Sequence, residues 1–205
     1  MKVGLIDYGR GNLRSVEKAL VRAGAEVRLV ESGDQIGELN WLVLPGVGSF
    51  GDAMANLHDR GLVEPIQIWL SEGRPFLGIC LGFQLLFSES EESPGVDGLG
   101  WVPGKVVKFD PSVGKVPHMG WNQVQAGPAI ADNGITDCFG DDSYYYHVHS
   151  YYADGLPEEW IACRTDYGQP FISGLKKDNA YAFQFHPEKS QDLGLKLLTR
   201  CLTTN

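Results

Sequence analysis

The N-terminal half of the chain alternates short apolar runs with segments whose apolar residues recur at helical spacing. Strands that are buried on both faces of a sheet appear as continuous apolar runs, and amphipathic helices show a period of about 3.6 residues. Three segments predict helices. The first begins after Asn12, and the other two cover residues 65–70 and 82–87. This alternation indicates a mainly parallel sheet with helices on both faces. The predicted strands are Val3–Asp7, Glu26–Val30, Trp41–Leu44 and Phe76–Ile79.

Two of the predicted helices carry boundary signals. Asn12 is expected to cap the first helix, and Gly24 is expected to end it. Ser190 is expected to cap a final helix in the same way. The apolar positions of these two helices are Leu13, Val16, Leu20 and Ala23 in the first, and Leu193, Leu197 and Leu198 in the last.

The pattern of apolar and polar residues changes after residue 88. The acidic, turn-rich segment Glu89–Asp97 predicts an exposed loop. Beyond it, short β-rich runs are separated by Gly, Pro and Asp, which favours antiparallel strands that pack on or extend the first sheet. These runs are Lys105–Phe109, Tyr144–Tyr152, Trp160–Arg164 and Ala180–Phe185.

Composition narrows the class of protein further. With 205 residues, 43% of them hydrophobic and 21% charged, the chain suits one folded domain and excludes a disordered class. A net charge of −9 without a basic run argues against a nucleic-acid surface. No apolar stretch reaches the ~20 residues of a membrane helix, and the N-terminus lacks a secretory signal. The four cysteines form no C-x-x-C pair, so we expect reduced thiols and a cytoplasmic protein.

The window Gly78-Ile79-Cys80-Leu81-Gly82 carries the strongest chemical signal. An apolar strand runs into Gly-x-Cys-x-Gly and a helix begins directly afterwards, which is the thiol form of a nucleophile elbow. The glycines leave room for a sharp turn, and the helix N-terminus favours the thiolate of Cys80. The Leu81 N–H is placed to bind an oxyanion. The alternative is a buried structural cysteine between two packing glycines.

A thiol nucleophile needs a base and a group that orients the base. His186 follows an aromatic, β-like run, and Glu188 lies two residues further on. In extended geometry both side chains project to the same side, so the carboxylate can orient the imidazole. By itself this pair is also compatible with a surface ion pair. Its coexistence with the elbow favours catalysis.

The remaining histidines do not predict a metal centre. His147 and His149 alternate along one strand and face the same side, which makes a metal pair conceivable. No Cys or Asp at ligand spacing accompanies them, and His58 and His118 carry no metal signal of their own. We therefore expect no metal site.

A glycine-rich loop is expected from Pro45 to Gly51, and Gly46–Gly51 matches G-x-G-x-x-G. A dinucleotide site is disfavoured, because the motif follows the third strand and the first βα turn has Arg14 in place of its third glycine. We expect no cofactor. An N–H from the Val47–Gly48 region is better suited to complete an oxyanion hole with Leu81.

Together these segments resemble the class I (triad) glutamine amidotransferases. The blocks that carry the resemblance are 44–48, 78–84 and 185–188, and further likeness covers 7–13, 45–54, 116–122 and 186–190. The resemblance implies a three-layer α/β fold over residues 1–205 as a single domain. Its central, mostly parallel sheet is flanked by helices, with antiparallel β additions in the C-terminal half. One departure is His147, where the family more often has Phe.

The resemblance also implies a reaction and a set of site residues. Cys80, His186 and Glu188 would form the catalytic triad that releases ammonia from glutamine through a thioester. Val47, Gly48 and Leu81 would hold the oxyanion. Gln84 and the backbone of Ser150 and Tyr151 would bind glutamine.

Within the family, the likeness is to glutaminase subunits that pass ammonia to a (β/α)8-barrel cyclase in histidine biosynthesis. The residues that the resemblance would place at that interface are Asn12, Trp121, Tyr146 and Lys189, with Trp121 exposed in a turn. The alternatives are a paralogous subunit that serves a sugar-aminating or pyridoxal phosphate synthase, a cysteine hydrolase that acts alone, and a non-enzymatic binding module.

Overall fold

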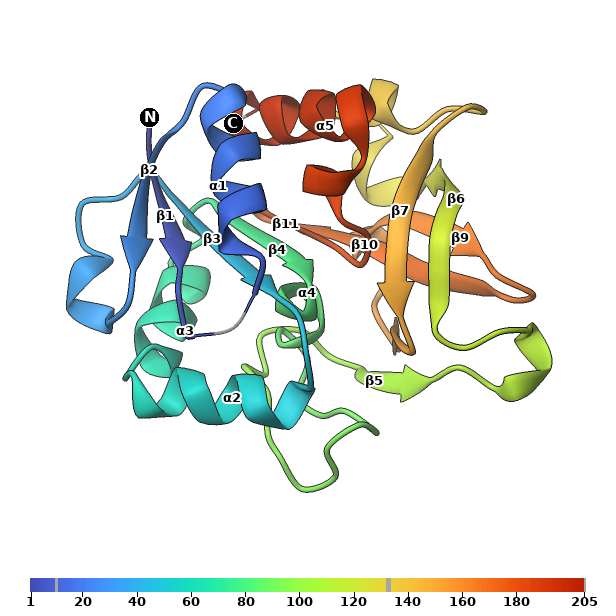
Figure 1. The fold of residues 1–205 in the computed structure, drawn as a ribbon, viewed down its shortest axis with the longest axis horizontal. Helices are drawn as coiled ribbons and strands as arrows, with labels where there is room; N and C mark the ends of the chain where they lie inside the picture. Colours follow the sequence, from blue (N-terminus) through green and yellow to red (C-terminus); the bar gives the residue numbers. More distant parts are fainter. Residues whose placement is uncertain (10, 132–133, 205) are drawn as a thin grey trace.

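Four parallel strands form one end of the sheet in the computed structural model, which describes residues 1–9, 11–131 and 134–204. Arg10, in the block 7–13, lies outside the described residues. The order at this end is β2-β1-β3-β4 (Figure 1). Every residue of β3 and β4 is buried, which explains their unbroken apolar sequence. The bounds are Lys2–Ile6 for β1, Glu26–Val30 for β2, Trp41–Gly46 for β3 and Phe76–Cys80 for β4.

Helices cover both faces of this parallel end. α1 and α5 lie over one face, and α2 and α3 lie over the other (Figure 1). Val16 and Leu20 of α1 share an apolar cluster with Leu197 and Leu198 of α5. The helices on the opposite face contribute to a second cluster on their own side of the sheet. The bounds are Leu13–Arg22 for α1, Phe50–Asp59 for α2, Val63–Ser71 for α3, Leu81–Gln84 for α4 and Gln191–Thr203 for α5.

The C-terminal half extends the same sheet with mainly antiparallel strands. β11 pairs parallel to β4, and the order continues β11-β10-β9-β6-β7, while β5 and β8 lie off this path. This arrangement sets β11 directly beside the strand that ends at Cys80. The bounds are Lys105–Lys108 for β5, His118–Ala126 for β6, Tyr144–His149 for β7, Tyr151–Asp154 for β8, Ile161–Asp166 for β9, Pro170–Lys177 for β10 and Ala180–Phe183 for β11.

Short 3-10 turns join several of these elements, and the last of them, η6, carries part of the site described below. The turns are η1 (Gly33–Gln35), η2 (Pro111–Val113), η3 (Pro128–Ile130), η4 (Thr136–Cys138), η5 (Glu158–Trp160) and η6 (Pro187–Lys189).

The predicted parallel sheet with antiparallel additions is confirmed, but several elements differ. The prediction missed α2, β6 and β10. The expected loop at 45–51 is wrong at both ends, because Pro45 and Gly46 pair with β4 as part of β3 and α2 begins at Phe50. The helix expected over 82–87 is a single turn that starts at Leu81.

Three local expectations are also wrong. Asn12 precedes α1, but its side chain makes no capping hydrogen bond. Ser190 precedes α5 without capping it; its hydroxyl instead donates to the His186 carbonyl oxygen and accepts from the Tyr146 N–H. Trp121 lies within strand β6, opposite Tyr146, and not in a turn.

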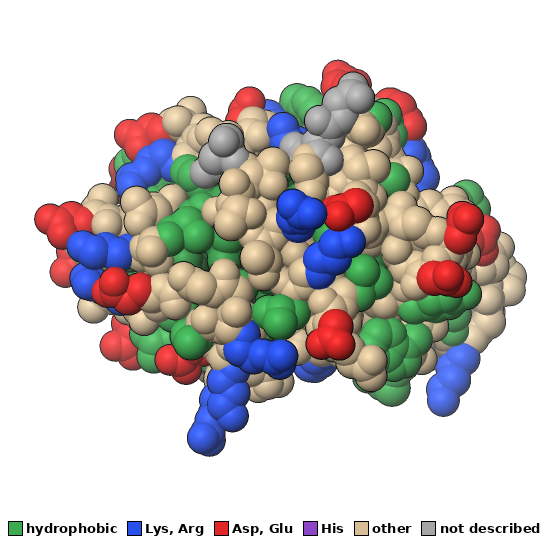
Figure 2. All heavy atoms as spheres, turned by 90° about the horizontal axis from the view of Figure 1, so that it is seen from above, with side chains coloured by type: hydrophobic (Ala, Val, Ile, Leu, Met, Phe, Trp, Pro, Cys, Tyr) green, Lys and Arg blue, Asp and Glu red, His purple; other side chains and the backbone are tan. Residues whose placement is uncertain are grey.

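Charged side chains are mixed on the face that lies above α1 and α5. Figure 2 shows Lys and Arg interspersed with Asp and Glu across this face. Among the residues that the structure describes, no helix has the length and apolar character needed to cross a membrane.

Candidate active site

Cys80 sits at the sharp junction between β4 and α4. Its φ is +54°, a conformation that residues with a side chain rarely adopt, so the backbone at this position is strained. A Cβ at Gly82 would overlap the Leu44 carbonyl oxygen, and one at Gly78 would lie 3.0 Å from the Ala182 Cβ. The two glycines are therefore required by the close packing of the turn against β3 and β11. The predicted elbow geometry is present.

His186 and Glu188 form a buried pair just beyond the end of β11. The His186 Nδ1 lies 2.8 Å from the Glu188 Oε1, and each side chain is only 2% exposed. The carboxylate fixes the proton on Nδ1, which leaves Nε2 as the nitrogen that can exchange a proton. No residue in the described part of the chain hydrogen-bonds to this Nε2. The surface ion pair is ruled out by the burial.

The charge state of His186 follows from its neighbours. Burial alone lowers the pKa of His186, because it disfavours the cation. The thiolate form of Cys80 and the Glu188 carboxylate act in the opposite direction, and their sum raises the pKa above its ordinary value. The arrangement thus favours the protonated form of His186 beside the Cys80 sulfur.

A cavity of about 340 Å³ opens above these groups. It is bounded by the elbow on one side and by the β7–β8 junction on the other. The predicted nucleophile, base, oxyanion strip and glutamine-binding residues all reach it. Its lining includes Val47, Gly48, Cys80, Leu81, Gln84, His149, Ser150, Tyr151 and His186.

The stretch between β3 and α2 forms the rim of the cavity near Cys80. Gly48 has a φ of +104°, which glycine adopts readily, and Val47 is 39% exposed. The Ser49 side chain accepts a hydrogen bond from the Asp52 N–H and caps α2. Because Gly46 is held in the sheet opposite Cys80, the part of this strip that is free of sheet pairing is Val47–Gly48.

Comparison with known proteins identifies the family. A family model described as "Glutamine amidotransferase class-I" matches residues 4–203. The chain belongs to the class I glutamine amidotransferases. The predicted fold class and the predicted family are therefore confirmed.

Several class I amidotransferases are similar over nearly the whole chain. One is "Imidazole glycerol phosphate synthase subunit HisH" of Desulfitobacterium hafniense (strain DSM 10664 / DCB-2), 48% identical over 197 residues, which cover 96% of this chain and 91% of the relative. A protein of the same name in Methanothermobacter thermautotrophicus is 49% identical and covers 96% of this chain and 95% of the relative. "Imidazole glycerol phosphate synthase hisHF, chloroplastic" of Arabidopsis thaliana is 45% identical over 98% of this chain but only 34% of its own length.

Solved structures agree on the fold. "Structure of PurLQS from Thermotoga maritima" superposes with a TM-score of 0.75 at 20% identity and covers 98% of this chain and 95% of that one. A "Crystal structure of glutamine amidotransferase" gives a TM-score of 0.72 at 20% identity, with 96% of each chain covered. At this identity the likeness concerns the fold alone.

Two amide side chains meet next to Cys80 of this amidotransferase. The Gln84 Nε2 donates to the Tyr151 carbonyl oxygen and to the Gln184 Oε1, at 3.0 Å each. The Gln184 Nε2 in turn lies 3.8 Å from the Cys80 sulfur. Sequence reasoning missed Gln184; the only signal for it was its position two residues before His186, on the same side of an extended segment.

Glu92 was also missed, because it lies in a segment that predicted only an exposed loop. Its Oε2 accepts a hydrogen bond of 2.7 Å from the Phe50 N–H at the start of α2, and the residue lines the cavity. The segment 89–97 is mostly exposed as predicted, but this contact ties it to α2. Glu92 therefore brings a negative charge to the cavity wall.

The residues predicted for a partner interface lie around the outer edge of the catalytic pair. Trp121 is 47% exposed, and its ring centre lies 6.2 Å from that of Tyr146. The Lys189 ammonium is 5.8 Å from the Tyr146 ring centre, and the Tyr146 ring is 6.5 Å from that of His186. Asn12 is exposed at the start of α1. Three of the four residues thus form one continuous rim.

Three further histidines, His118, His147 and His149, lie together at the β6–β7 pairing, and His149 also lines the cavity. Burial lowers the pKa of His118 to about 4, and burial with the neighbouring His118 lowers that of His149 to about 3. Burial also lowers the pKa of His147, with smaller contributions from the other two rings. The three imidazoles are neutral at pH 7.

Proposed function

We propose that this chain is the glutaminase subunit of imidazole glycerol phosphate synthase and that it hydrolyses glutamine to glutamate and ammonia for histidine biosynthesis. The observation that carries the proposal is the buried His186–Glu188 pair, which opens on the same cavity as the strained Cys80. The whole-length similarity to proteins named as the HisH subunit supports the choice of pathway.

In the first half of the reaction, the Cys80 thiolate attacks the side-chain amide carbon of glutamine. The carbonyl π electrons move to oxygen, and the resulting oxyanion is held by the Leu81 N–H and an N–H of Val47–Gly48. When the C–N bond breaks, the imidazolium of His186 donates its Nε2 proton to the departing nitrogen. Ammonia leaves, and a γ-glutamyl thioester remains on Cys80.

In the second half, the neutral His186 accepts a proton from water as the water oxygen attacks the thioester carbon. The C–S bond then breaks, glutamate leaves and the thiolate–imidazolium pair is restored. Glu188 keeps the His186 Nδ1 protonated in both halves and stabilises each imidazolium that forms. One water is consumed for each ammonia released.

The cavity also offers complementary groups for the rest of the substrate. The carboxylate of Glu92 complements the α-ammonium group of glutamine. The backbone at Ser150 and Tyr151 lies on the opposite wall, where its polar groups are suited to the substrate's main chain. Gln84 positions this wall through its hydrogen bond to the Tyr151 carbonyl oxygen.

We further propose that the ammonia passes to the cyclase subunit, the (β/α)8 barrel HisF, which forms imidazole glycerol phosphate and an aminoimidazole carboxamide nucleotide. The rim of Trp121, Tyr146 and Lys189, together with Asn12, is the surface we assign to that partner. Aromatic residues and a few charged groups around an active-site mouth suit such an interface.

We also propose that the partner controls the oxyanion hole. The Val47–Gly48 strip is free of sheet pairing, and Gly48 lacks a Cβ, so its peptide can turn from presenting a carbonyl to presenting an N–H. A cyclase with bound nucleotide would select the second state. Crystal structures of the complex with and without nucleotide test this; an identical strip in both, with activity still following nucleotide, would contradict it.

The deciding experiment is glutamate release by the purified chain, first alone and then with the cyclase subunit of the same genome and its nucleotide. We expect a low rate alone and a steep rise only when both are added. A high rate alone, or no response to the cyclase, would keep the glutaminase chemistry and point to a different synthase. No glutamate under any condition would contradict the role of Cys80.

A further inference from the structure

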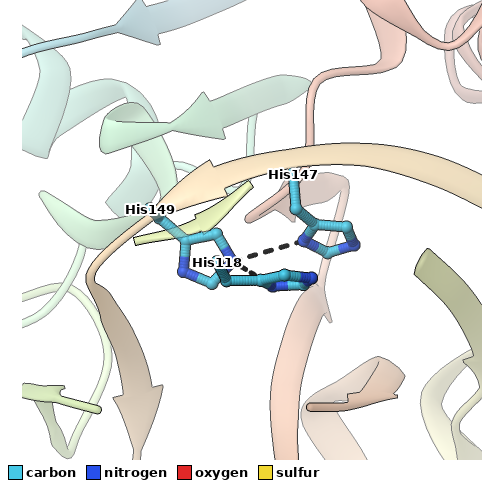
Figure 3. Close-up of side chains that lie close together, drawn as sticks. All are labelled: His118, His147 and His149. Carbon is cyan, nitrogen blue, oxygen red and sulfur yellow. Dashed lines mark hydrogen bonds between the residues drawn. The ribbon is translucent and has the colours of Figure 1, made fainter. Parts of the chain in front are cut away.

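The three histidines lie close together beside the cavity, which His149 also lines. His118 comes from β6, and His147 and His149 come from β7, with His118 directly opposite His149 in the sheet register. The His149 Nε2 lies 3.3 Å from the Nδ1 of His118 and 3.3 Å from the Nδ1 of His147 (Figure 3). One nitrogen from each of the three rings lies within 4.8 Å of the other two.

Two of these distances match the spacing of ligand nitrogens around a bound metal ion. Zinc–imidazole bonds of about 2.0–2.1 Å in a tetrahedral site separate two ligand nitrogens by about 3.3–3.4 Å. The two 3.3 Å edges around His149 already have this length. Three histidines with a fourth position for solvent are an established zinc ligand set.

The rings are held by packing as well as by hydrogen bonds. His118 stacks between Tyr167 and His147, with ring centres 4.0 Å and 4.6 Å away. The His147 ring meets Phe171 and Phe185 edge-on at 6.0 Å and 5.6 Å. Because the His118 and His147 planes are only 23° apart, at least one of these two rings must turn for both nitrogens to face the same ion.

His149 is already in the protonation state that a metal requires. Its Nδ1 lies 2.8 Å from the Tyr151 carbonyl oxygen, which can only accept, so the proton is on Nδ1. The Nε2 lone pair therefore points at the other two rings. A backbone carbonyl behind the ligand ring is the usual support of a metal-binding histidine.

We propose that His118, His147 and His149 form a binding site for a divalent transition-metal ion, with Zn²⁺ as the reference ligand. The ion would join β6 to β7 behind the wall that carries Ser150 and Tyr151. The proposal does not depend on the reaction at Cys80, because none of the three rings takes part in it.

Metal binding through the Nδ1 of His118 requires a change of tautomer and a turn of the Asn122 amide. The Asn122 Nδ2 donates to the His118 Nε2 at 3.2 Å, so the His118 proton is on Nδ1. When Nδ1 binds the ion, the proton must sit on Nε2 and the Asn122 oxygen must face it, which breaks the hydrogen bonds of this amide to the Asp166 carbonyl oxygen and from the Gln123 N–H. The His147 Nε2 has no partner among the described residues, so moving a proton to it breaks no hydrogen bond of that atom.

The experiment is calorimetric titration of the tag-free, chelator-treated Cys80→Ala chain with Zn²⁺, together with the visible spectrum of the Co²⁺ form. The Cys80→Ala background removes the catalytic thiolate as a competing ligand. We expect one ion per chain and the intense absorption of tetrahedral Co²⁺. Adding His147→Phe should weaken Zn²⁺ binding by more than about 100-fold, because it removes a direct ligand.

A control makes the result specific. His58→Phe, which removes an exposed histidine of α2, should leave binding unchanged. Equal affinity of the His147→Phe chain and its parent, or an octahedral Co²⁺ spectrum, would overturn the proposal. A loss of binding in His58→Phe would assign the ion to a different site.

Discussion

His186 and the three clustered histidines are all almost completely buried, yet they are in opposite charge states. The His186 side chain has a carboxylate at 2.8 Å and a thiolate beside it, and its pKa is raised. The clustered rings have one another and backbone groups as partners, and their pKa values are lowered. Burial acts in the same direction on all four. The comparison shows that the neighbouring anions, and not the degree of burial, decide whether the pKa of a buried histidine is raised or lowered.

The largest expected effect comes from removing the Cys80 sulfur, which helps to raise the pKa of His186. Cys80→Ala should lower glutamate formation by more than about 10⁴-fold, since the covalent route is lost. In the complex with the cyclase, synthesis from free ammonium should persist, because the barrel's chemistry is separate. Loss of both activities would mean that the substitution had damaged folding or assembly.

Removal of the Glu188 carboxylate leaves His186, like the three clustered histidines, without a carboxylate partner. Glu188→Gln should lower kcat by about 10³–10⁴-fold, because the amide neither stabilises the imidazolium nor fixes the proton on Nδ1. The alkaline limit of the remaining activity should move to lower pH, since one of the groups that raises the pKa of His186 is gone. A pH profile of kcat for both proteins tests this; an unmoved alkaline limit would contradict the electrostatic role of Glu188.

The cluster should make the protein acid-sensitive. Its rings bind fewer protons when folded than when unfolded, so stability is retained above the ordinary pKa of 6.5 and is lost as pH falls toward about 4. Each such histidine contributes up to about 1.4 kcal/mol per pH unit. Urea unfolding between pH 7 and 4, in chelator, should give a shallower decline for His147→Phe than for the parent. Parallel declines would show that His147 is not kept neutral.

At His186 the pKa shift changes the stability of the fold with pH in the opposite direction. Its pKa is higher in the folded protein than in the unfolded chain, so its contribution is fully present below 6.5 and is lost as pH rises through the raised value. Removing His186 should therefore weaken the alkaline loss of stability, whereas removing His147 acts on the acid side alone. The two variants together separate the two kinds of histidine.

The smallest expected effect concerns the rim outside His186. Trp121→Ala should weaken cyclase binding by about 10-fold, or 1–2 kcal/mol, because an exposed aromatic anchor is lost. Glutaminase activity of the isolated chain should not change. Titration of the variant with the cyclase measures the shift, and an unchanged dissociation constant would remove Trp121 from the interface.

The parts of the site that are local in sequence were predictable. The elbow is contiguous, and His186 and Glu188 are only two residues apart. The expected extended geometry of this pair is wrong, because Glu188 lies in the 3-10 turn η6, which brings the two side chains together instead. Their approach to Cys80 was inferred from chemistry and from the family resemblance, and not from any pattern in the chain.

The cluster and two of the strands were not predictable in this way. His118 meets His149 only through the β6–β7 register, and β6 was missed because it mixes polar residues with a glycine. β10 begins with a proline and contains a glycine, which weaken the strand signal. Gln184 likewise gains its contacts with Gln84 and Cys80 only once distant strands are paired.

The parallel pairing of β4 with β11 has a consequence for how this enzyme can diversify. Cys80 and His186 follow adjacent, hydrogen-bonded strands at the same edge of the sheet, with Phe183 aligned to Ile79. Their spacing is set across two strands and is independent of the long stretch of chain that joins them. Insertions in the intervening loops can therefore reshape the outer surface for a different synthase without disturbing catalysis. A single inserted residue within β11 would turn His186 to the opposite face of the sheet, and we expect that change to abolish catalysis.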